Sequence, residues 1–232
     1  MRSLMIITID GPSGTGKTTV AQRVADRLHF IYFDTGAMYR CFTWFVLENQ
    51  IDISDSLVVN ELLTKFDFNV VEKDDQKFYF VGNNNVTEVI RSRPVTLHVS
   101  AVSALKEVRE FLLTIQHRFA KMQKNIVFEG RDLGTVVFPN AGLKIFLTAD
   151  PQVRAERRLN EIHEKWPEQG KIINREQMLL DIIRRDEFDS TREIAPLRCS
   201  PGALKIDTSY LSIDQVVDQI VKYYENNSSK TS

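Results

Sequence analysis

Two hydrophobic patterns follow one another in the first thirty residues. Residues 4–9 (Leu-Met-Ile-Ile-Thr-Ile) form a nearly continuous apolar run, which is typical of a strand buried on both faces of a parallel sheet. Apolar residues at positions 20, 21, 24, 25 and 28 then recur at three- and four-residue spacing, and this period predicts an amphipathic helix over Lys17–Leu28. The chain therefore opens with a strand, a glycine-rich turn and a helix in direct succession.

The same alternation continues along most of the chain. Short apolar runs predict strands at Ile31–Phe33, Ile126–Phe128, Lys144–Leu147 and Leu204–Ile206, and a helical pattern covers Met38–Leu47. Strands that alternate with helices predict an α/β fold whose parallel sheet is wound right-handedly.

Residues 66–89 break this alternation. Three short strand-like runs, Phe68–Val71, Lys77–Val81 and Val86–Val89, are separated by polar sequences that are rich in Asn, Asp and Gly. Such sequences are typical of turns. We expect a small antiparallel sheet inserted into the α/β domain, and a surface hairpin without a role is the alternative.

The length fits this organisation. The 232 residues are 43% hydrophobic and 26% charged, a composition that is typical of a globular protein. One domain that carries an insertion is the expected arrangement. We predict a core of residues 1–60 and 100–226, an insertion of about residues 61–99 and a flexible tail at 227–232.

The charges nearly cancel over the whole chain. Lys and Arg number 30 against 31 Asp and Glu, for a net charge of −1, so no overall positive field attracts a nucleic-acid polymer or an anionic membrane. The two cysteines lack metal-ligand spacing and fit a reducing compartment. Because the early apolar run is too short for a signal peptide or a membrane span, we expect a cytoplasmic protein.

A phosphate-binding loop follows the first predicted strand. Residues 11–18 read Gly-Pro-Ser-Gly-Thr-Gly-Lys-Thr and match the P-loop pattern at every required position. Glycines let successive backbone N–H groups point at phosphate oxygens, and the following helix adds its positive N-terminal end. We expect Lys17 to reach the β- and γ-phosphates and the Thr18 hydroxyl to bind Mg²⁺. The predicted ATP-binding residues of the loop are Gly11, Pro12, Ser13, Gly14, Thr15, Gly16, Lys17, Thr18 and Thr19.

The class of P-loop protein is a separate question. A GTPase needs an Asp-x-x-Gly switch motif and an Asn-Lys-x-Asp guanine-reading motif, and the sequence contains neither. This absence disfavours a GTPase. Two carboxylates are candidates for supporting the metal: Glu129, directly after the predicted strand Ile126–Phe128, and Asp10, at the end of the first strand.

Polar residues also follow the second and third predicted strands. The segment 34–40 opens a helix that Thr35 can cap, and it brings the Tyr39 ring and the Arg40 guanidinium. The segment Arg131–Asp132 follows the third strand. Ligands bind at the carboxyl ends of strands in open α/β sheets, so both segments are candidate substrate contacts. Ordinary helix capping and a structural ion pair are the alternatives.

Arginine outnumbers lysine in the last third of the chain. Eight of the 17 arginines lie in residues 154–198, which hold only two lysines, and Arg is suited to oriented, bidentate contacts with anions. Arg185, Asp189 and Arg192 are spaced by four and three residues, hence on one face if the helix persists. We expect a phosphate-clamping lid at about residues 158–174, and a solvated helix with salt bridges is the alternative.

Four segments together resemble the bacterial cytidylate kinases, a family of P-loop nucleoside monophosphate kinases. They are residues 11–17 (GPSGTGK), 34–40 (DTGAMYR), 130–139 (GRDLGTVVFP) and 195–197 (APL). The resemblance implies a P-loop NTPase three-layer fold with a central five-stranded parallel sheet, a small antiparallel β insertion in the monophosphate-binding region, and a helical lid. It also implies ATP-dependent phosphorylation of CMP and dCMP to CDP and dCDP, with Mg²⁺, by a monomer.

The resemblance further implies a role for individual residues. Ser100, Arg109 and Asp132 read the cytosine edge, and Asp132 accepts a hydrogen bond from the exocyclic amine. Arg157 belongs to the ATP side of the lid. Thr35 stands where many relatives have Ser, and its extra methyl group narrows the room near the base.

The implied substrate contacts form a larger set. The α-phosphate of CMP meets Arg40, Arg131 and Arg192, and the sugar meets Asp189 together with Arg185. The implied catalytic residues are Lys17, Arg131, Arg185 and Arg192. The implied CMP-binding residues are Thr35, Tyr39, Arg40, Ser100, Arg109, Arg131, Asp132, Arg185, Asp189 and Arg192.

Transfer between two phosphates needs no general base. The accepting phosphate oxygen is largely ionised at neutral pH, because its second pKa is about 6. Catalysis then consists of positioning and charge neutralisation. A kinase for another nucleoside monophosphate or a small acceptor is one alternative. A non-catalytic P-loop switch is the other, and the missing switch motifs disfavour it.

Overall fold

The chain divides by its internal contacts into two units. The first lies within residues 1–33 and 120–232, and the second is residues 34–119. The computed structural model describes residues 5–74, 76–123, 125–165 and 173–228. The predicted insertion at about 61–99 falls inside the second unit, and its boundaries and role stay a prediction.

A five-stranded parallel sheet forms the centre of the first unit. Its strand order is β2-β6-β1-β7-β8; β1 pairs in parallel with β6 and β7, and β7 pairs in parallel with β8. This sheet confirms the predicted α/β fold. The strands are β1 (Met5–Asp10), β2 (Ile31–Asp34), β6 (Asn125–Gly130), β7 (Leu143–Thr148) and β8 (Leu204–Asp207).

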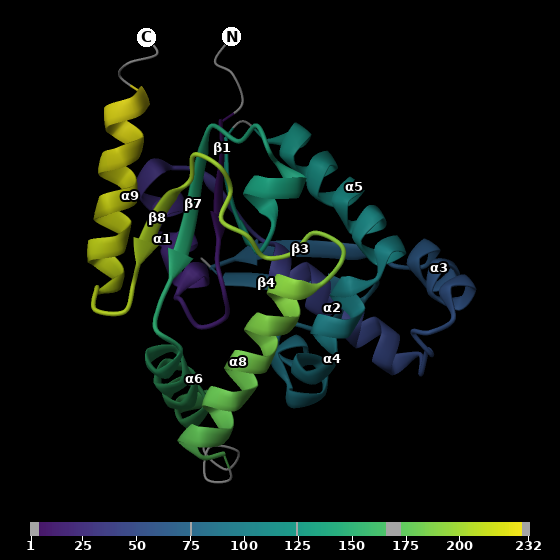
Figure 1. Cartoon of the computed structure of the whole chain (residues 1–232). Coiled ribbons are helices and arrows are strands. Elements are labelled where there is room, and N and C mark those ends of the chain that lie inside the picture. The colour runs from purple at the N-terminus through teal and green to yellow at the C-terminus, as the bar shows by residue number, and fades with distance from the viewer. Residues whose placement is uncertain (1–4, 75, 124, 166–172, 229–232) are drawn as a thin grey trace. The chain divides into compact units, whose positions relative to one another are not determined.

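The main apolar core of this unit lies between the sheet and the helices α1 (Lys17–Leu28) and α9 (Ile213–Ser228) (Figure 1). Ile7 and Val24 are fully buried there, as the three-to-four spacing of apolar residues on α1 predicts. Because β1 and α1 are both anchored in this core, the turn between them is held at both ends.

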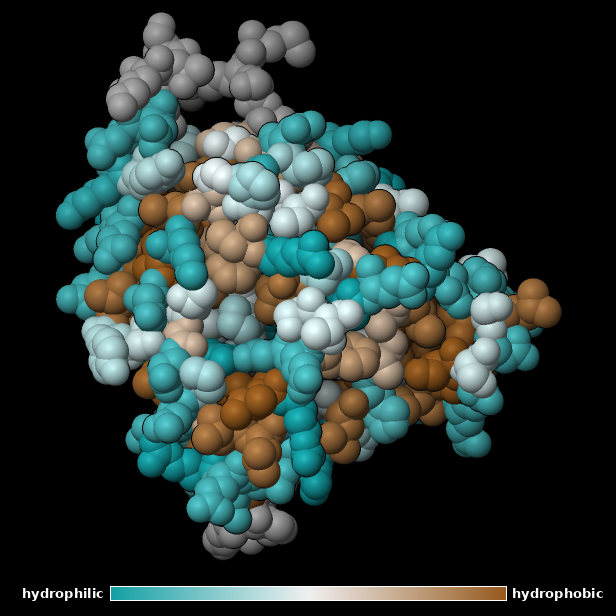
Figure 2. Space-filling view, in the orientation of Figure 1, coloured by the Kyte–Doolittle hydropathy of each residue, from teal (hydrophilic) through white to brown (hydrophobic). Residues whose placement is uncertain are grey.

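A second, smaller core joins α6 (Pro151–Lys165) and α8 (Arg175–Thr191) (Figure 1). On its outer side α8 leaves Leu180 and Ile183 about half exposed, and Figure 2 shows apolar atoms gathered in this part of the surface. The predicted lid includes residues 166–172, which lie outside the described residues. The buried side chains of this core are Ala155, Leu159, Ile162, Met178 and Ile182.

The second unit combines an antiparallel sheet with helices. The sheet has the order β3-β4-β5, and the register pairs Phe68 with Val81 and Lys73 with Gln76. This confirms the predicted small antiparallel sheet. The elements are α2 (Thr35–Glu48), α3 (Ser56–Thr64), β3 (Phe68–Lys73), β4 (Gln76–Val81), β5 (Asn84–Asn85), η1 (Val89–Arg91), α4 (Arg93–Ala104) and α5 (Lys106–Met122), the last of which ends beyond the unit.

The predicted third strand, Val86–Val89, is wrong. The strand that follows β4 and pairs with it is β5, Asn84–Asn85, which begins two residues earlier than the predicted strand. After it, the Thr87 Oγ1 atom accepts a hydrogen bond from the Tyr79 N–H at 2.9 Å and donates one to the Asn85 side chain at 2.7 Å. The Val86 N–H still donates to the Tyr79 carbonyl at 2.8 Å, but the Tyr79 N–H is bonded to the Thr87 side chain, and the chain then turns into the 3₁₀ helix η1.

The last helix, α9, continues to Ser228 and so includes the first two residues of the predicted tail at 227–232. The flexibility of this tail stays a prediction. Residues 229–232 lie outside the described residues.

None of the helices in the described ranges has the length and apolar character that crossing a membrane requires. Cys41 and Cys199 are both free thiols; the first is buried and the second is exposed.

Candidate functional site

The P-loop lies between the end of β1 and the start of α1, as predicted. Gly11 and Gly14 have φ angles of 149° and 79°, in the region that L-residues with a side chain rarely adopt. A Cβ atom on Gly11 would collide with the Leu147 carbonyl of β7, and one on Gly14 would lie 3.0 Å from the Arg154 Cβ atom. Glycine is therefore required at positions 11 and 14 for two reasons: the backbone conformation and the close neighbours.

Lys17 is buried at the start of α1, with 7% of its surface exposed. Its ammonium group donates a hydrogen bond to the Pro12 carbonyl at 2.7 Å, across the loop. Burial, followed by the positive charges of Arg131 and Arg185, lowers the pKa of Lys17 well below its usual range. A bound anion would offset this repulsion, so the surroundings of Lys17 favour a phosphate group.

Thr18 and Glu129 meet beside the P-loop. The Thr18 hydroxyl donates to the Glu129 carboxylate at 2.8 Å, and the Tyr32 hydroxyl donates to the same carboxylate at 2.8 Å. Hydroxyl and carboxylate oxygens are ligands that suit Mg²⁺. Of the two carboxylates that the sequence left open, Glu129 is therefore the one that lies with the predicted metal ligand.

Asp10 is committed to the backbone instead. Its two carboxylate oxygens accept hydrogen bonds from the N–H groups of Leu133 and Gly134 at 3.0 and 2.8 Å. These residues begin η2 (Leu133–Val137), a π-helical turn directly after Asp132. Asp10 thus ties the end of β1 to the segment that carries Arg131 and Asp132.

Burial raises the pKa of Asp10 to about 7, against the lowering effect of the Gly134 and Leu133 amides. The unfolded chain therefore loses this proton at lower pH than the folded chain, and the stability contributed by Asp10 falls as pH rises from about 4 to about 7. Asp10→Asn should remove this dependence. The free energy of unfolding of wild type relative to Asp10→Asn is expected to fall by up to about 4 kcal/mol across the window, measured by urea unfolding at several pH values.

A control for this experiment is Asp52→Asn. Asp52 is exposed, and the hydrogen bonds from Ser54 lower its pKa, so its stability contribution is lost only in more acidic solution. The difference between wild type and Asp52→Asn should stay constant from pH 5 to pH 8. A constant difference for Asp10→Asn as well would contradict the prediction.

Three of the predicted substrate residues form one charge cluster, in which Asp189 is buried and the two arginines are partly buried. Arg131 donates to the Asp189 carboxylate at 3.2 Å, and Arg185 approaches the same carboxylate at 4.0 Å. Burial and the nearby Arg131 lower the pKa of Arg185 to about 10. Two guanidinium groups thus share one carboxylate, which leaves an excess of positive charge close to Lys17.

Arg192 and Asp132 form a second pair. The Arg192 guanidinium donates to Asp132 at 3.4 Å and to the Ala195 carbonyl from its Nε at 2.8 Å. The helix α8 ends at Thr191, so Arg192 caps it and does not continue the face of Arg185 and Asp189. The structure brings Arg192 to Asp132 through the turn after the helix.

Within the second unit, the structure brings Tyr39 and Arg109 together, with the Arg109 guanidinium 5.7 Å from the centre of the Tyr39 ring. Arg40 donates to the Ile90 carbonyl at 3.1 Å and to the Thr96 hydroxyl at 2.9 Å. Ser100 lies on the same helix, α4, as Thr96, the partner of Arg40.

The predicted capping role of Thr35 is wrong. The N-cap residue of α2 is Asp34, whose side chain accepts a hydrogen bond from the Ala37 N–H at 2.8 Å. Thr35 is the first residue inside the helix and is 4% exposed. Asp is as good a cap as Thr, and α2 begins at Thr35, one residue earlier than a Thr35 cap requires.

Arg157 reaches the P-loop through a residue that the sequence did not indicate. Its guanidinium donates to the Thr208 carbonyl at 2.6 Å, and the Thr208 hydroxyl donates to the Thr15 carbonyl at 3.1 Å. Thr208 comes directly after β8, so its place at the carboxyl end of a sheet strand is the signal that could have identified it.

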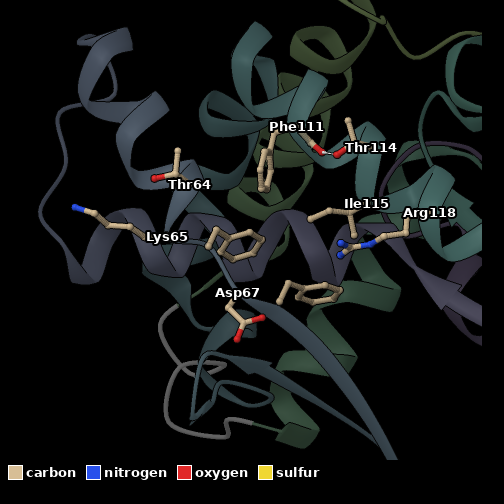
Figure 3. A pocket seen from close by; sticks show the side chains of 9 residues that line it. Thr64, Lys65, Asp67, Phe111, Thr114, Ile115 and Arg118 are labelled. Atoms are coloured by element: carbon tan, nitrogen blue, oxygen red, sulfur yellow. Dashed lines mark hydrogen bonds between the residues drawn. The ribbon is translucent and has the colours of Figure 1, made fainter.

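A pocket of about 290 Å³ lies in the second unit and contains none of the predicted site residues. Figure 3 shows Phe111 in the upper part of the view, Ile115 and the Arg118 guanidinium on the right, and Lys65 and Asp67 on the left and below. Its lining is Thr64, Lys65, Phe66, Asp67, Phe68, Phe111, Thr114, Ile115 and Arg118.

The sequence is similar to proteins that carry one family name. A family model described as Cytidylate kinase matches residues 7–226. A cytidylate kinase of Protochlamydia amoebophila is 50% identical over 97% of this chain and 99% of its own, and one of Bacillus subtilis is 40% identical over 98% of this chain and 100% of its own. A solved structure, an uncharacterized protein from Eubacterium ventriosum, is 14% identical with a TM-score of 0.51, covers 97% of this chain and 99% of its own, and shares the fold alone.

Proposed function

The chain belongs to the cytidylate kinase family, and we propose that it transfers the γ-phosphoryl group of ATP reversibly to CMP and dCMP, giving ADP and CDP or dCDP. One observation of the site supports this most directly. Lys17 is buried beside the partly buried Arg131 and Arg185, and burial followed by these two positive charges lowers its pKa. Such a concentration of cations beside a P-loop is suited to gathering two phosphate groups against their mutual repulsion.

On the donor side, the P-loop N–H groups and Lys17 would hold the β- and γ-phosphates of ATP. Arg157, linked to the loop through Thr208, belongs to the same side in this proposal. Thr18 and Glu129 would hold Mg²⁺, which when bound neutralises charge between the β- and γ-phosphates. Their 2.8 Å hydrogen bond places a neutral hydroxyl oxygen beside an anionic carboxylate oxygen, and both kinds of oxygen are suitable magnesium ligands.

On the acceptor side, the arginines orient the phosphate of CMP. Arg131 is held by Asp189, so its guanidinium has a fixed direction, and Arg40 and Arg192 are proposed to meet the same phosphate. Arg185 and Asp189 are proposed to meet the sugar. Because the accepting oxygen is already largely ionised, these residues need only align it with the γ-phosphoryl group and exclude water.

Base recognition is assigned in this proposal to Asp132 with Ser100 and Arg109, and Thr35 and Tyr39 complete the CMP contacts. A carboxylate that is 6% exposed accepts hydrogen bonds and donates none when ionised. It can accept from the amine of cytosine, whereas the corresponding carbonyl of uracil would place a second acceptor opposite it. This asymmetry gives a physical basis for selecting CMP over UMP.

A panel of acceptors tests the proposed reaction. Purified protein, ATP and Mg²⁺ are incubated with CMP, dCMP, UMP, AMP, GMP and small alcohols, and ADP release is measured for each. We expect CMP and dCMP to give the highest kcat/KM. A higher kcat/KM for any other acceptor would refute the substrate assignment, and no turnover with any acceptor would refute the kinase assignment. The monomeric state and the cytoplasmic location form part of the same proposal, and light scattering of the purified chain tests the first of them.

A further inference from the structure

Arg154 connects three segments of the first unit. It lies near the start of α6 and is 3% exposed. Its Nε donates to the Ala149 carbonyl at 3.0 Å, its Nη1 donates to the Ser13 carbonyl of the P-loop at 3.1 Å, and its Nη2 lies 2.6 Å from the Asp186 carboxylate on α8. The planar fork of arginine makes three such contacts in fixed directions, which a lysine ammonium on its flexible stem does not.

The contact between α6 and the P-loop is also a close steric one. A Cβ atom on Gly14 would lie 3.0 Å from the Arg154 Cβ atom and 3.3 Å from the Arg154 carbonyl. The Gly14 backbone thus packs directly against Arg154 on α6. The guanidinium of the same arginine binds the Ser13 carbonyl of the loop. A shift of Arg154 would therefore move the P-loop.

Asp186 lies between two proposed substrate residues. Arg185 precedes it, and Asp189 follows it by three residues on the same helix. The carboxylate of Asp186 is 25% exposed, whereas the Arg154 side chain is 3% exposed. A buried guanidinium must be paired to be tolerated, so the position of Asp186, and with it the arginine-bearing part of α8, is constrained by Arg154.

We propose that Arg154 and Asp186 are positioning residues. They fix the part of α8 that carries Arg185 relative to the P-loop during phosphoryl transfer. The inference rests on the proposed function. Neither residue touches the reacting atoms in this scheme; each acts through Ser13 and Arg185. A displacement of about 1 Å in such a site can lower the rate about 10²-fold, so a contact that sets the position of an arginine has a large effect without contributing to binding.

Two substitutions test the two partners of the Arg154–Asp186 ion pair one at a time. Asp186→Asn keeps the shape of the side chain and removes the charge that pairs with Arg154. Arg154→Lys keeps a cation near Asp186 and removes the simultaneous bonds to Ser13 and Ala149. We expect each to lower the kcat for CMP phosphorylation about ten-fold or more, with the KM for ATP and for CMP within about three-fold of wild type. Because both act on one contact, the double variant should lose less than the product of the two effects.

A matched control is Glu156→Gln. Glu156 pairs with Arg175 at 3.9 Å, so this ion pair also joins α6 to α8, but both side chains are more than half exposed. Exposed pairs contribute little to stability, and this one has no bond to the P-loop. Its kcat should remain within about two-fold of wild type.

Loss of folding is separated from loss of positioning by expressing kcat per folded molecule, with the folded fraction taken from near-ultraviolet circular dichroism. Asp186→Glu, which restores the carboxylate, should recover at least half of the lost activity. The proposal is overturned if Asp186→Asn and Arg154→Lys retain kcat within two-fold of wild type per folded molecule, or if their effects multiply independently. Wild-type protein that fails to phosphorylate CMP would instead refute the proposed function, so the two failures are distinct.

Discussion

Lys17→Ala is expected to lower the kcat for CMP phosphorylation by about 10³-fold or more. The Lys17 ammonium lies inside the P-loop, 2.7 Å from the Pro12 carbonyl, and its charge is proposed to stabilise the γ-phosphoryl group as it moves between two phosphates. Removing one preorganised charge of this kind from a buried site typically costs 10² to 10³ in kcat, and the loss is greater where no other cation can replace it. An assay that couples ADP release to a second enzyme, at saturating ATP and CMP, measures the effect.

The same substitution should leave the fold intact. Burial lowers the pKa of Lys17 well below its usual range, which means that the folded chain carries this charge at a cost. Alanine removes that cost, so the midpoint of thermal unfolding is expected to stay equal to wild type or to rise. Lys65→Ala serves as the control, because Lys65 is exposed and pairs only with Glu61 among the described residues. Wild-type kcat in Lys17→Ala would refute the role of the P-loop.

The segment from β1 to α1 could be predicted because its signals are local. An apolar run of six residues and a three-to-four spacing are both properties of neighbouring positions, and the structure places β1 at Met5–Asp10 and α1 at Lys17–Leu28. The P-loop between them has the glycines that its φ angles require. Each of these features is encoded within about one turn of helix or one strand.

The predictions that the structure contradicts concern segments in which two local conformations have similar energies. Asp34 and Thr35 are both suitable helix caps, and the choice between them depends on where α2 begins. Val86–Val89 has the composition of a strand, but the Tyr79 N–H of β4 bonds to the Thr87 side chain, which in turn bonds to the Asn85 side chain. Tertiary context decides such cases, and pattern alone does not.

The contacts that organise the site are not local at all. Thr18 meets Glu129 across 111 positions, and Arg154 meets the Ser13 carbonyl across 141. The sequence offered both Asp10 and Glu129 as metal-side carboxylates, and they are distinguished by the hydrogen bond from Thr18 to Glu129 and by the backbone bonds that Asp10 accepts. The roles of individual residues toward CMP stay predictions, since they depend on a ligand.

Asp132→Asn is expected to reduce the preference for CMP over UMP, expressed as the ratio of their kcat/KM values, by about 10²-fold. The Asp132 carboxylate is 6% exposed and, when ionised, accepts hydrogen bonds only, so it can pair with the amine of cytosine but faces a second acceptor in the carbonyl of uracil. An asparagine amide can donate to that carbonyl. A buried unpaired polar group costs about 1 to 3 kcal/mol, and removing this penalty from UMP while weakening CMP supplies the expected change.

The ratio also separates base reading from the structural role of Asp132. The carboxylate accepts a hydrogen bond from Arg192 at 3.4 Å, and Arg192 is proposed to bind the phosphate that CMP and UMP share. Damage transmitted through Arg192 must therefore lower kcat/KM equally for both acceptors and leave their ratio unchanged. The dCMP and dUMP pair repeats the comparison with a different sugar and the same bases. An unchanged ratio in both pairs would contradict base reading by Asp132 and would assign its effect to the orientation of Arg192.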